Sequence, residues 1–244
     1  ADYLDPSDTT GRTAKYLLDG DVTDELGTYD GTATDITYGV GKFGSQAAIF
    51  NGTSSVIKKD TGFATLGQAY SVSAFVKINL GQAAVQTIVS TGDGLATARS
   101  DNMSILTDNT LQLAVNSGLG GGTAVSLVGY DDGEFHHIAA VYIGSGLCEL
   151  YLDGALVGSF TSTTALAAST SMYIGAQDNT PDRNWFLGSI DQVEIFPTAL
   201  IASEVQDLYN TGKTKLAHNQ TFTPTFACKE DNVNLDISFD GGTN

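Results

Sequence analysis

LCELYLDGALVGSF, residues 147–160, predicts a β-hairpin. Two runs of alternating apolar and polar residues flank Asp153-Gly154, a pair that tolerates the positive φ angles of a tight two-residue turn. The same period of two recurs at residues 72–78, 111–116 and 137–142, and each run predicts a strand with one face in a core. Many short strands separated by turn sequences are typical of a β-sandwich or barrel.

One short helix is predicted after Pro197. Ser203 can cap it, Gln206 can close a capping box, and Gly212 is typical of a helix end. The apolar residues that would line one face are Ile201, Val205, Leu208 and Tyr209. A helix this short on a β body covers an edge and does not form a domain of its own.

The sequence pattern changes after Lys215, which divides the chain into a sandwich at residues 1–215 and a β-rich tail at residues 216–244. The tail alternates apolar and polar residues in two runs around residues 229–232. An isolated hairpin is marginal in water. We therefore expect residues 217–244 to pack on the body, pair with other copies, or dock on a larger assembly such as a capsid or fibre.

Composition excludes some classes of protein. The chain has 244 residues, a formal charge of -17 and a pI near 4.1, so phosphate backbones are repelled and nucleic acid is not an expected partner. No apolar run reaches the length of a membrane span. Cys148 and Cys228 could form a disulfide or remain two thiols, and the start at Ala1 fits loss of a leader or of an initiator Met.

A series of short motifs resembles a known family. In chain order they are Leu18-Asp19-Gly20, Gly41-Lys42-Phe43-Gly44, Phe50-Asn51-Gly52-Thr53-Ser54-Ser55, Ser71-Val72-Ser73-Ala74-Phe75-Val76, Phe135-His136-His137-Ile138-Ala139, Leu150-Tyr151-Leu152-Asp153-Gly154, Leu187-Gly188-Ser189-Ile190-Asp191-Gln192-Val193, and Ala199-Leu200 with Glu204-Val205. Their order over residues 10–212 resembles laminin-G-like jelly rolls of the concanavalin A-like lectin/glucanase superfamily. The resemblance implies an all-β protein: a two-sheet antiparallel jelly-roll sandwich with one short C-terminal helix, to which this chain adds a β tail. Relatives usually open the His-Ile-Ala strand with Trp, where this chain has Phe135, a change expected to affect packing.

The resemblance also implies a structural Ca²⁺ site. An acid in the Ile-Asp-x-Val strand, an N-terminal acidic turn and a main-chain carbonyl near the Asn-Gly turn meet at one ion in the superfamily, which gives Asp19, Gly52 and Asp191 here. Asp191 interrupts an apolar strand where alternation slips, as expected if a bulge re-aims it. The alternative is that Asp191 only accepts backbone hydrogen bonds in that bulge.

Glycoside hydrolysis is the catalytic alternative. Some concanavalin A-like enzymes are retaining glucanases with two catalytic carboxylates on a Glu-x-Asp-x-x-Glu strand, about 5 Å apart. The nearest match is residues 189–194, where Ser189 occupies the place of the nucleophile. We therefore predict that the chain is not an enzyme.

Two polar loops are candidates for ligand binding. Trp185, the only Trp, follows Asp178, Arg183 and Asn184 in one loop, and the other contains Arg99, Asp101 and Asn102. Sugars stack on aromatic rings and hydrogen-bond to such groups. The alternative for Trp185 is a half-buried ring beside the strand that begins near Leu187.

These observations favour a non-catalytic binding or adhesion module for a glycan or protein surface, displayed on an assembly such as a phage or virus particle. The alternatives are a free secreted lectin-like protein and, less favoured, a glycoside hydrolase. The expected location is a virion surface or the extracellular space. His136 and His137 point to opposite faces of one strand and cannot chelate one metal.

Overall fold

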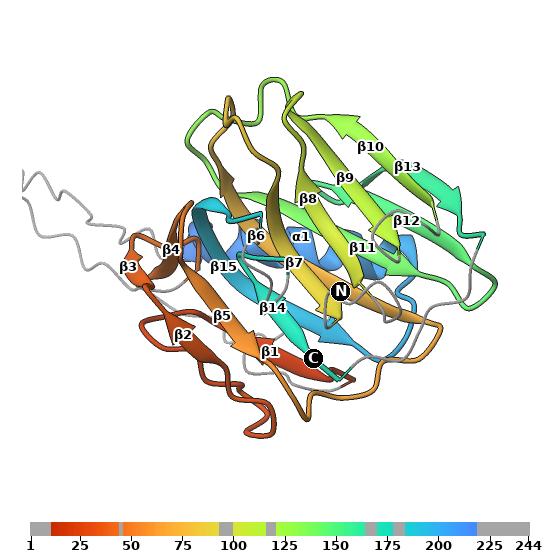
Figure 1. The fold of residues 1–244 in the computed structure, drawn as a ribbon, viewed down its shortest axis with the longest axis horizontal. Helices are drawn as coiled ribbons and strands as arrows, with labels where there is room; N and C mark the ends of the chain where they lie inside the picture. The colour runs from red at the N-terminus through yellow and green to blue at the C-terminus, as the bar shows by residue number, and fades with distance from the viewer. Residues whose placement is uncertain are drawn as a thin grey trace, which may run out of the picture.

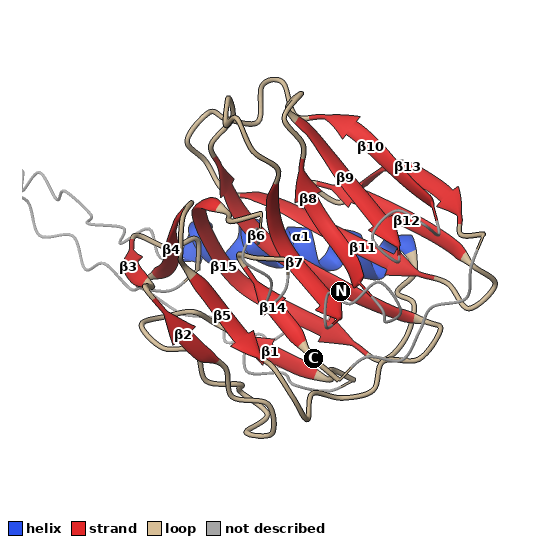
Figure 2. Ribbon diagram, in the orientation of Figure 1, coloured by secondary structure: helices blue, strands red, loops and turns tan. Residues whose placement is uncertain are grey.

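A computed structural model describes residues 11–43, 46–92, 100–115, 121–163, 170–177 and 184–218. These residues form two antiparallel sheets and one helix (Figures 1 and 2). The predicted all-β two-sheet sandwich is confirmed. Of the β-rich tail predicted at residues 216–244, residues 216–218 belong to the helix, and residues 219–244, with Cys228, lie outside the described residues.

The first sheet, sheet A, has the order β13-β12-β11-β6-β15-β4-β3, with β1 also paired to β15. Its strands are β1 (Ala14–Tyr16), β3 (Thr37–Gly39), β4 (Ala47–Asn51), β6 (Tyr70–Ile78), β11 (His136–Tyr142), β12 (Leu147–Leu152), β13 (Ala155–Thr161) and β15 (Leu187–Phe196). The second sheet, sheet B, has the order β10-β9-β8-β7-β14-β5-β2. Its strands are β2 (Thr32–Thr34), β5 (Val56–Lys59), β7 (Gln86–Gly92), β8 (Ser100–Ile105), β9 (Thr110–Val115), β10 (Gly121–Ser126) and β14 (Met172–Ile174).

The core lies between the sheets and consists mainly of aliphatic side chains from alternate strand positions. One polar group inside it is the carboxylate of Asp101, which accepts a hydrogen bond of 2.7 Å from the Tyr70 hydroxyl. Tyr70 stacks on Tyr142 with ring centroids 4.1 Å apart. Burial raises the pKa of Tyr142, which therefore stays protonated.

The predicted hairpin is confirmed: β12 and β13 pair antiparallel across Asp153 (φ 49°) and Gly154 (φ 79°). The bulge predicted at Asp191 is confirmed too, because the pairing of β15 with β6 shifts register between Asp191 and Glu194. Gln192, inside the bulge, has a φ of 47°.

The helix differs from its prediction. It spans Ala202–His218 (α1), so Gly212 lies within it. The Glu204 carboxylate accepts the Ile201 amide hydrogen at 2.8 Å, which is the capping-box bond that the sequence assigned to Gln206. Figure 1 shows α1 behind sheet A, and Val205 packs against Ala139, Val141 and Tyr151 on the outer face of that sheet. Ile201, expected on the buried face, is 64% exposed.

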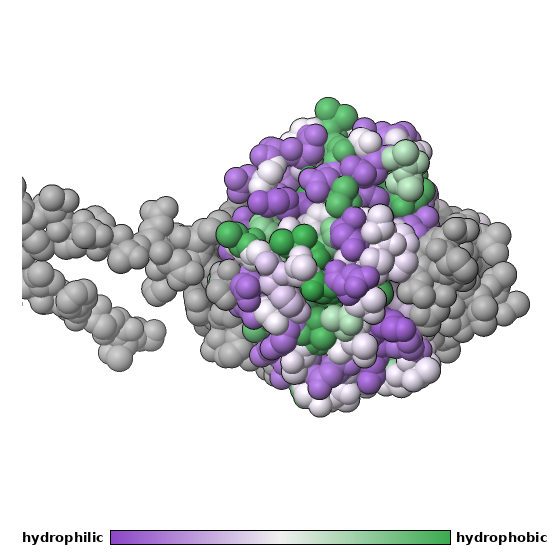
Figure 3. Space-filling model, turned by 60° about the vertical axis from the view of Figure 1, so that its left-hand side comes forward, coloured by the Kyte–Doolittle hydropathy of each residue, from purple (hydrophilic) through white to green (hydrophobic). Residues whose placement is uncertain are grey.

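The described residues on the face drawn in Figure 3 are mostly polar. A narrow, broken band of apolar residues crosses the face drawn in Figure 3. No helix in the described part of the chain has the length and apolar character that a membrane span requires.

Candidate functional site

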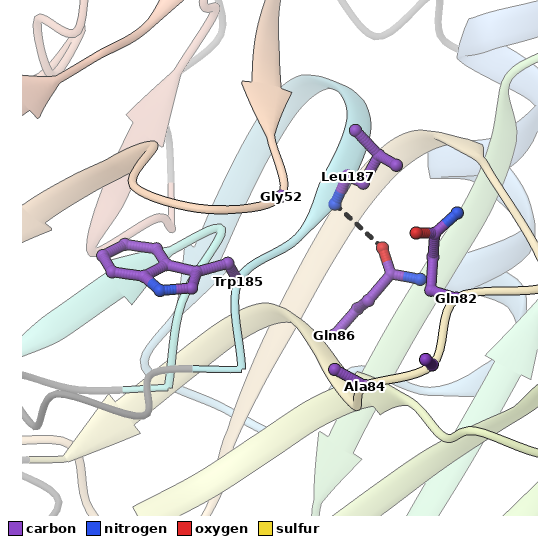
Figure 4. A pocket seen from close by; sticks show the side chains of 7 residues that line it. Gly52, Gln82, Ala84, Gln86, Trp185 and Leu187 are labelled. Atoms are coloured by element: carbon purple, nitrogen blue, oxygen red, sulfur yellow. Dashed lines mark hydrogen bonds between the residues drawn. The ribbon is translucent and has the colours of Figure 1, made fainter.

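A pocket lies at one end of the sandwich, where three connections pass between the two sheets (Figure 4). The β4–β5 turn contributes Gly52, the β6–β7 connection contributes residues 82–84, and the segment between β14 and β15 contributes Trp185. Gln86 at the start of β7 and Leu187 at the start of β15 complete the lining, and the volume is about 230 Å³. The sequence predicted Trp185 for ligand binding, named Gly52 only as a calcium ligand, and gave no indication of the two glutamines.

Gln86 holds the wall of this pocket together. Its side chain is buried, its Oε1 accepts the Leu187 amide hydrogen at 2.8 Å, and its Nε2 donates to the Asn79 carbonyl at 3.3 Å. One amide therefore ties β7 to both β15 and the end of β6. Gln82 is half-buried, and Figure 4 places it on the same side of the pocket as Gln86, with Trp185 on the other side.

Trp185 is half-buried, which is the alternative that the sequence offered to a ligand platform. Its ring packs against Val56, Tyr173 and Ala176 at the outer face of sheet B, and the residue remains half-buried. The preceding residue, Asn184, adopts a φ of 50°, and its carbonyl accepts the Thr87 amide hydrogen at 2.7 Å. These contacts fix the backbone that carries the indole, so the ring is anchored on one side and accessible in part.

The other predicted ligand residues do not reach this pocket or lie outside the described residues. Asn102 lies within strand β8, where a loop had been expected, and is 6% exposed. It pairs with Ser90, four residues along β7 from Gln86, which is about 13 Å at the rise of a β-strand. Asp178, Arg183 and Arg99 lie outside the described residues.

The residues predicted to bind calcium separate into two places. Asp191 is 2% exposed, and its Oδ2 accepts amide hydrogens from Lys42 at 2.6 Å and Phe43 at 3.3 Å. Asp19 is exposed, and its Oδ1 accepts the Gln46 amide hydrogen at 2.7 Å. Both carboxylates thus approach the same 42–46 segment.

Gly52 is remote from this pair of carboxylates. Its amide donates to the carbonyl of Phe186, just before β15. Asp191 lies five residues further along that strand, which is about 16 Å from Phe186 at the rise of a β-strand. A described carbonyl nearer to the two carboxylates is that of Gln46. A Cβ built on Gly41 would stand 2.2 Å from the Gln46 carbonyl oxygen and 3.0 Å from Asp191 Oδ2. Only a residue without a Cβ allows this close approach, which brings the Gln46 carbonyl and the Asp191 carboxylate together beside Gly41. Both are oxygen groups, the ligand type that Ca²⁺ takes.

Asp24, in the same acidic loop, has a different role. It is 1% exposed, and its two oxygens accept four backbone amide hydrogens between Lys15 and Tyr29. Among the described residues, no group of three or more His, Cys, Asp or Glu side chains could hold a metal ion.

The strand that resembles a glucanase motif holds its carboxylates in structural contacts. Glu194 is 2% exposed, forms an ion pair with Arg12, and accepts a hydrogen bond from the Gln192 side-chain amide. Ser189 stands where the nucleophile would be. The Asp191 carboxylate accepts backbone amides, and the Glu194 carboxylate is paired with Arg12.

The two histidines have separate surroundings. His136 lies between Asp153 at 2.9 Å and Asp132 at 3.2 Å. His137 is fully buried, and its Nε2 lies 2.8 Å from Ser73 Oγ. Burial lowers the pKa of His137 to about 4, so it is neutral at pH 7. They share no ligand position.

The fold and its end pocket define a class of protein: a jelly-roll β-sandwich with a surface site built from connections between the sheets. The chain belongs to the concanavalin A-like lectin/glucanases superfamily, because the model of its third laminin G family matches residues 50–206. No curated protein matches the chain.

Solved structures with this fold include domain 4 of AbnA, a GH43 extracellular arabinanase from Geobacillus stearothermophilus, in complex with arabinotriose. It is 26% identical, with a TM-score of 0.65, and the match covers 81% of this chain and 98% of that domain. The receptor binding domain of botulinum neurotoxin D is 12% identical (TM-score 0.60; 82% of this chain, 52% of that chain). A Trypanosoma rangeli sialidase is 13% identical (TM-score 0.65; 86% and 34%). This chain thus spans about half of the toxin domain and a third of the sialidase.

Proposed function

We propose that the chain is a non-catalytic glycan-binding module. The observation that carries the proposal is the half-buried indole of Trp185 at the wall of a pocket to which Gln82 and Gln86 also contribute. A sugar presents an apolar ring face to an aromatic side chain and hydroxyl groups to amides. The arabinotriose complex of AbnA domain 4, similar over almost all of that domain, supports a neutral oligosaccharide as the first ligand to test.

Calorimetric titration of the intact chain with arabinotriose and a panel of neutral oligosaccharides tests this proposal. Gln82→Ala and Trp185→Ala should each lower affinity, the latter by at least about tenfold, which is roughly 1.4 kcal/mol. Because the indole also packs on Tyr173, the melting temperature of Trp185→Ala must be measured alongside, and Trp185→Phe retains an aromatic ring as a matched control. Failure of every neutral glycan to bind would refute the proposal.

The absence of catalysis is part of the same proposal. It is supported by the ion pair of Glu194 with Arg12 and by Ser189 at the nucleophile position. Incubation with the bound glycan should release no reducing sugar. If the wild type releases reducing sugar and Glu194→Gln does not, the chain is an enzyme. That result would overturn the absence of catalysis and leave the proposal of glycan binding intact.

We also propose a structural Ca²⁺ held by Asp19, Asp191 and the Gln46 carbonyl. The support is that the Gln46 carbonyl and the Asp191 carboxylate meet beside Gly41, and that Asp19 accepts the Gln46 amide hydrogen. A chelator should lower the melting temperature of the wild type, and Asp19→Asn should abolish that response. Asp21→Asn, an exposed acid of the same loop, is the control and should keep it. If the chelator leaves the melting temperature of the wild type unchanged, the calcium site is refuted.

Display on a larger particle through residues 217–244 remains a proposal from the alternating sequence of the tail. It places the module at a virion surface or outside the cell. A chain that ends at His218 retains α1 and should stay folded but no longer join its assembly. Loss of folding would mean that the tail belongs to the sandwich.

A further inference from the structure

The end pocket has the size of a site for one sugar ring. Its volume of about 230 Å³ lies below the range of about 300–1,000 Å³ that is usual for drug-sized ligands. Two hydrogen bonds close its walls: the Gly52 amide donates to the Phe186 carbonyl at 3.0 Å, and the Leu187 amide donates to Gln86. Because these bonds join connections between the two sheets, they fix the wall of the pocket that Gly52, Gln86 and Leu187 form.

The chemistry of the walls is neutral. None of the seven described residues that line the pocket carries a charge. The side-chain amide of half-buried Gln82 can serve hydroxyl groups as donor and acceptor, whereas the Gln86 amide is buried and already bonded to Leu187 and Asn79. A carboxylate in the sugar would find no cation among these seven residues and would meet a protein of net charge -17.

Small residues keep the space open. Ala83 and Ala84 are exposed at the mouth of the pocket. At Gly52, whose φ is +74°, a Cβ would lie 3.0 Å from the Leu187 Cβ, so a larger residue there would press on the wall. The opening thus depends on side chains that end at Cβ or lack it.

We infer that this pocket binds the terminal residue of a neutral glycan, one sugar at a time. The inference rests on the proposed glycan-binding function and adds the mode of recognition: the chain reads an end, while an extended groove would read several consecutive sugars. A single ring offers few atoms, so the expected Kd is about millimolar. Affinity on a multivalent surface then comes from several copies binding at once.

The test is a titration of the full chain with neutral arabino-oligosaccharides, from the monosaccharide to the hexasaccharide. Terminal recognition predicts that Kd changes by no more than about threefold over the series. Ala84→Phe fills the pocket and should weaken every member by more than about tenfold, whereas Ala84→Ser keeps the space and should bind as the wild type does. A galacturonic acid series of the same lengths should not bind.

The outcomes separate the inference from the proposed function. Affinity that rises steadily with length and is indifferent to Ala84→Phe would overturn terminal recognition but preserve glycan binding. Equal binding of the galacturonic acid series would overturn the neutral selectivity. If neither this series nor other neutral oligosaccharides bind, the proposed function fails and the inference fails with it.

Discussion

Removal of the Asp24 carboxylate tests whether buried hydrogen bonds, and not a metal, hold the N-terminal acidic loop. The carboxylate accepts amide hydrogens from Lys15, Leu26, Thr28 and Tyr29 at 2.9, 3.2, 3.2 and 3.0 Å. Alanine leaves four donors without this acceptor. A buried donor without a partner costs about 1–3 kcal/mol.

Water can reach some of these donors, because three of the four hydrogen bonds are only partly buried. We therefore count about 1 kcal/mol for each donor and expect Asp24→Ala to lower the free energy of unfolding by about 4 kcal/mol. For a domain of this size that corresponds to a decrease in Tm of about 8–16 °C. Asp24→Asn should be nearly as damaging, because the side-chain NH₂ of asparagine would replace one oxygen and face two of the backbone N–H donors.

Guanidinium unfolding followed by the fluorescence of Trp185, the single Trp, measures this change. Asp21→Ala is the matched control, because Asp21 is exposed and accepts one exposed amide hydrogen bond, from Thr23; its effect should stay within about 0.5 kcal/mol. An Asp24→Ala midpoint equal to that of the wild type would refute the reasoning. So would a difference between the two proteins that disappears in the presence of a chelator.

Gly175→Ala should destabilise by about 3–5 kcal/mol, because its φ is +82° and the new Cβ would stand 2.1 Å from the Phe50 ring; thermal melts would show this. Gly62→Ala shares the positive φ but meets no atom within 4 Å, so its cost should be only about 1 kcal/mol, and equal losses would contradict the packing argument. His137 has a folded pKa of about 4, below its unfolded value of about 6.5, so the unfolded chain binds more protons between these values. Stability should fall by up to about 3 kcal/mol as pH drops from 6.5 to 4, and His137→Gln should remove that part of the slope in pH-dependent denaturation. An unchanged slope in the variant would mean that other groups set the pH dependence.

The hairpin turn and the bulge could be predicted from the sequence because each depends on the chemistry of a few neighbouring residues. The Asp153-Gly154 turn follows from backbone conformations that these two residues tolerate, and the alternation on either side orients the strands. The bulge at Asp191 was predictable because a carboxylate in an apolar strand needs partners, and a shift in register supplies them from the amides of Lys42 and Phe43.

The limits of α1 were not predictable from the same kind of signal. Ser203 is a better capping residue than Ile201 by propensity, but the docking of Val205 on sheet A places the first turn earlier. Glu204 then lies three residues after Ile201 and bonds its amide. Gly212 costs about 1 kcal/mol within a helix and does not end one by itself.

The end pocket could be predicted only in part, because its residues come from three connections that are far apart in the sequence. Trp185 was recognisable as an aromatic residue in a polar loop. Gln82 and Gln86 had no such signal, because glutamine is common in loops. Their position opposite Trp185 follows from the way the two sheets bring the start of β7 and the start of β15 together.

The acidic loop shows why residue type alone does not assign a metal site. Asp19, Asp21 and Asp24 are chemically equivalent in the sequence, and all three are oxygen ligands that calcium could use. The fold separates them: Asp24 turns inward and accepts four amide hydrogens, Asp21 stays in solvent, and Asp19 approaches the 42–46 segment that also contacts Asp191. The number of backbone amides aimed at each carboxylate decides its role, and for Asp191 those amides lie more than a hundred residues away in the sequence. Asp24, which already accepts four amide hydrogens, gains little from a cation, so the exposed Asp19 is the member of this loop at which loss of calcium binding should be sought.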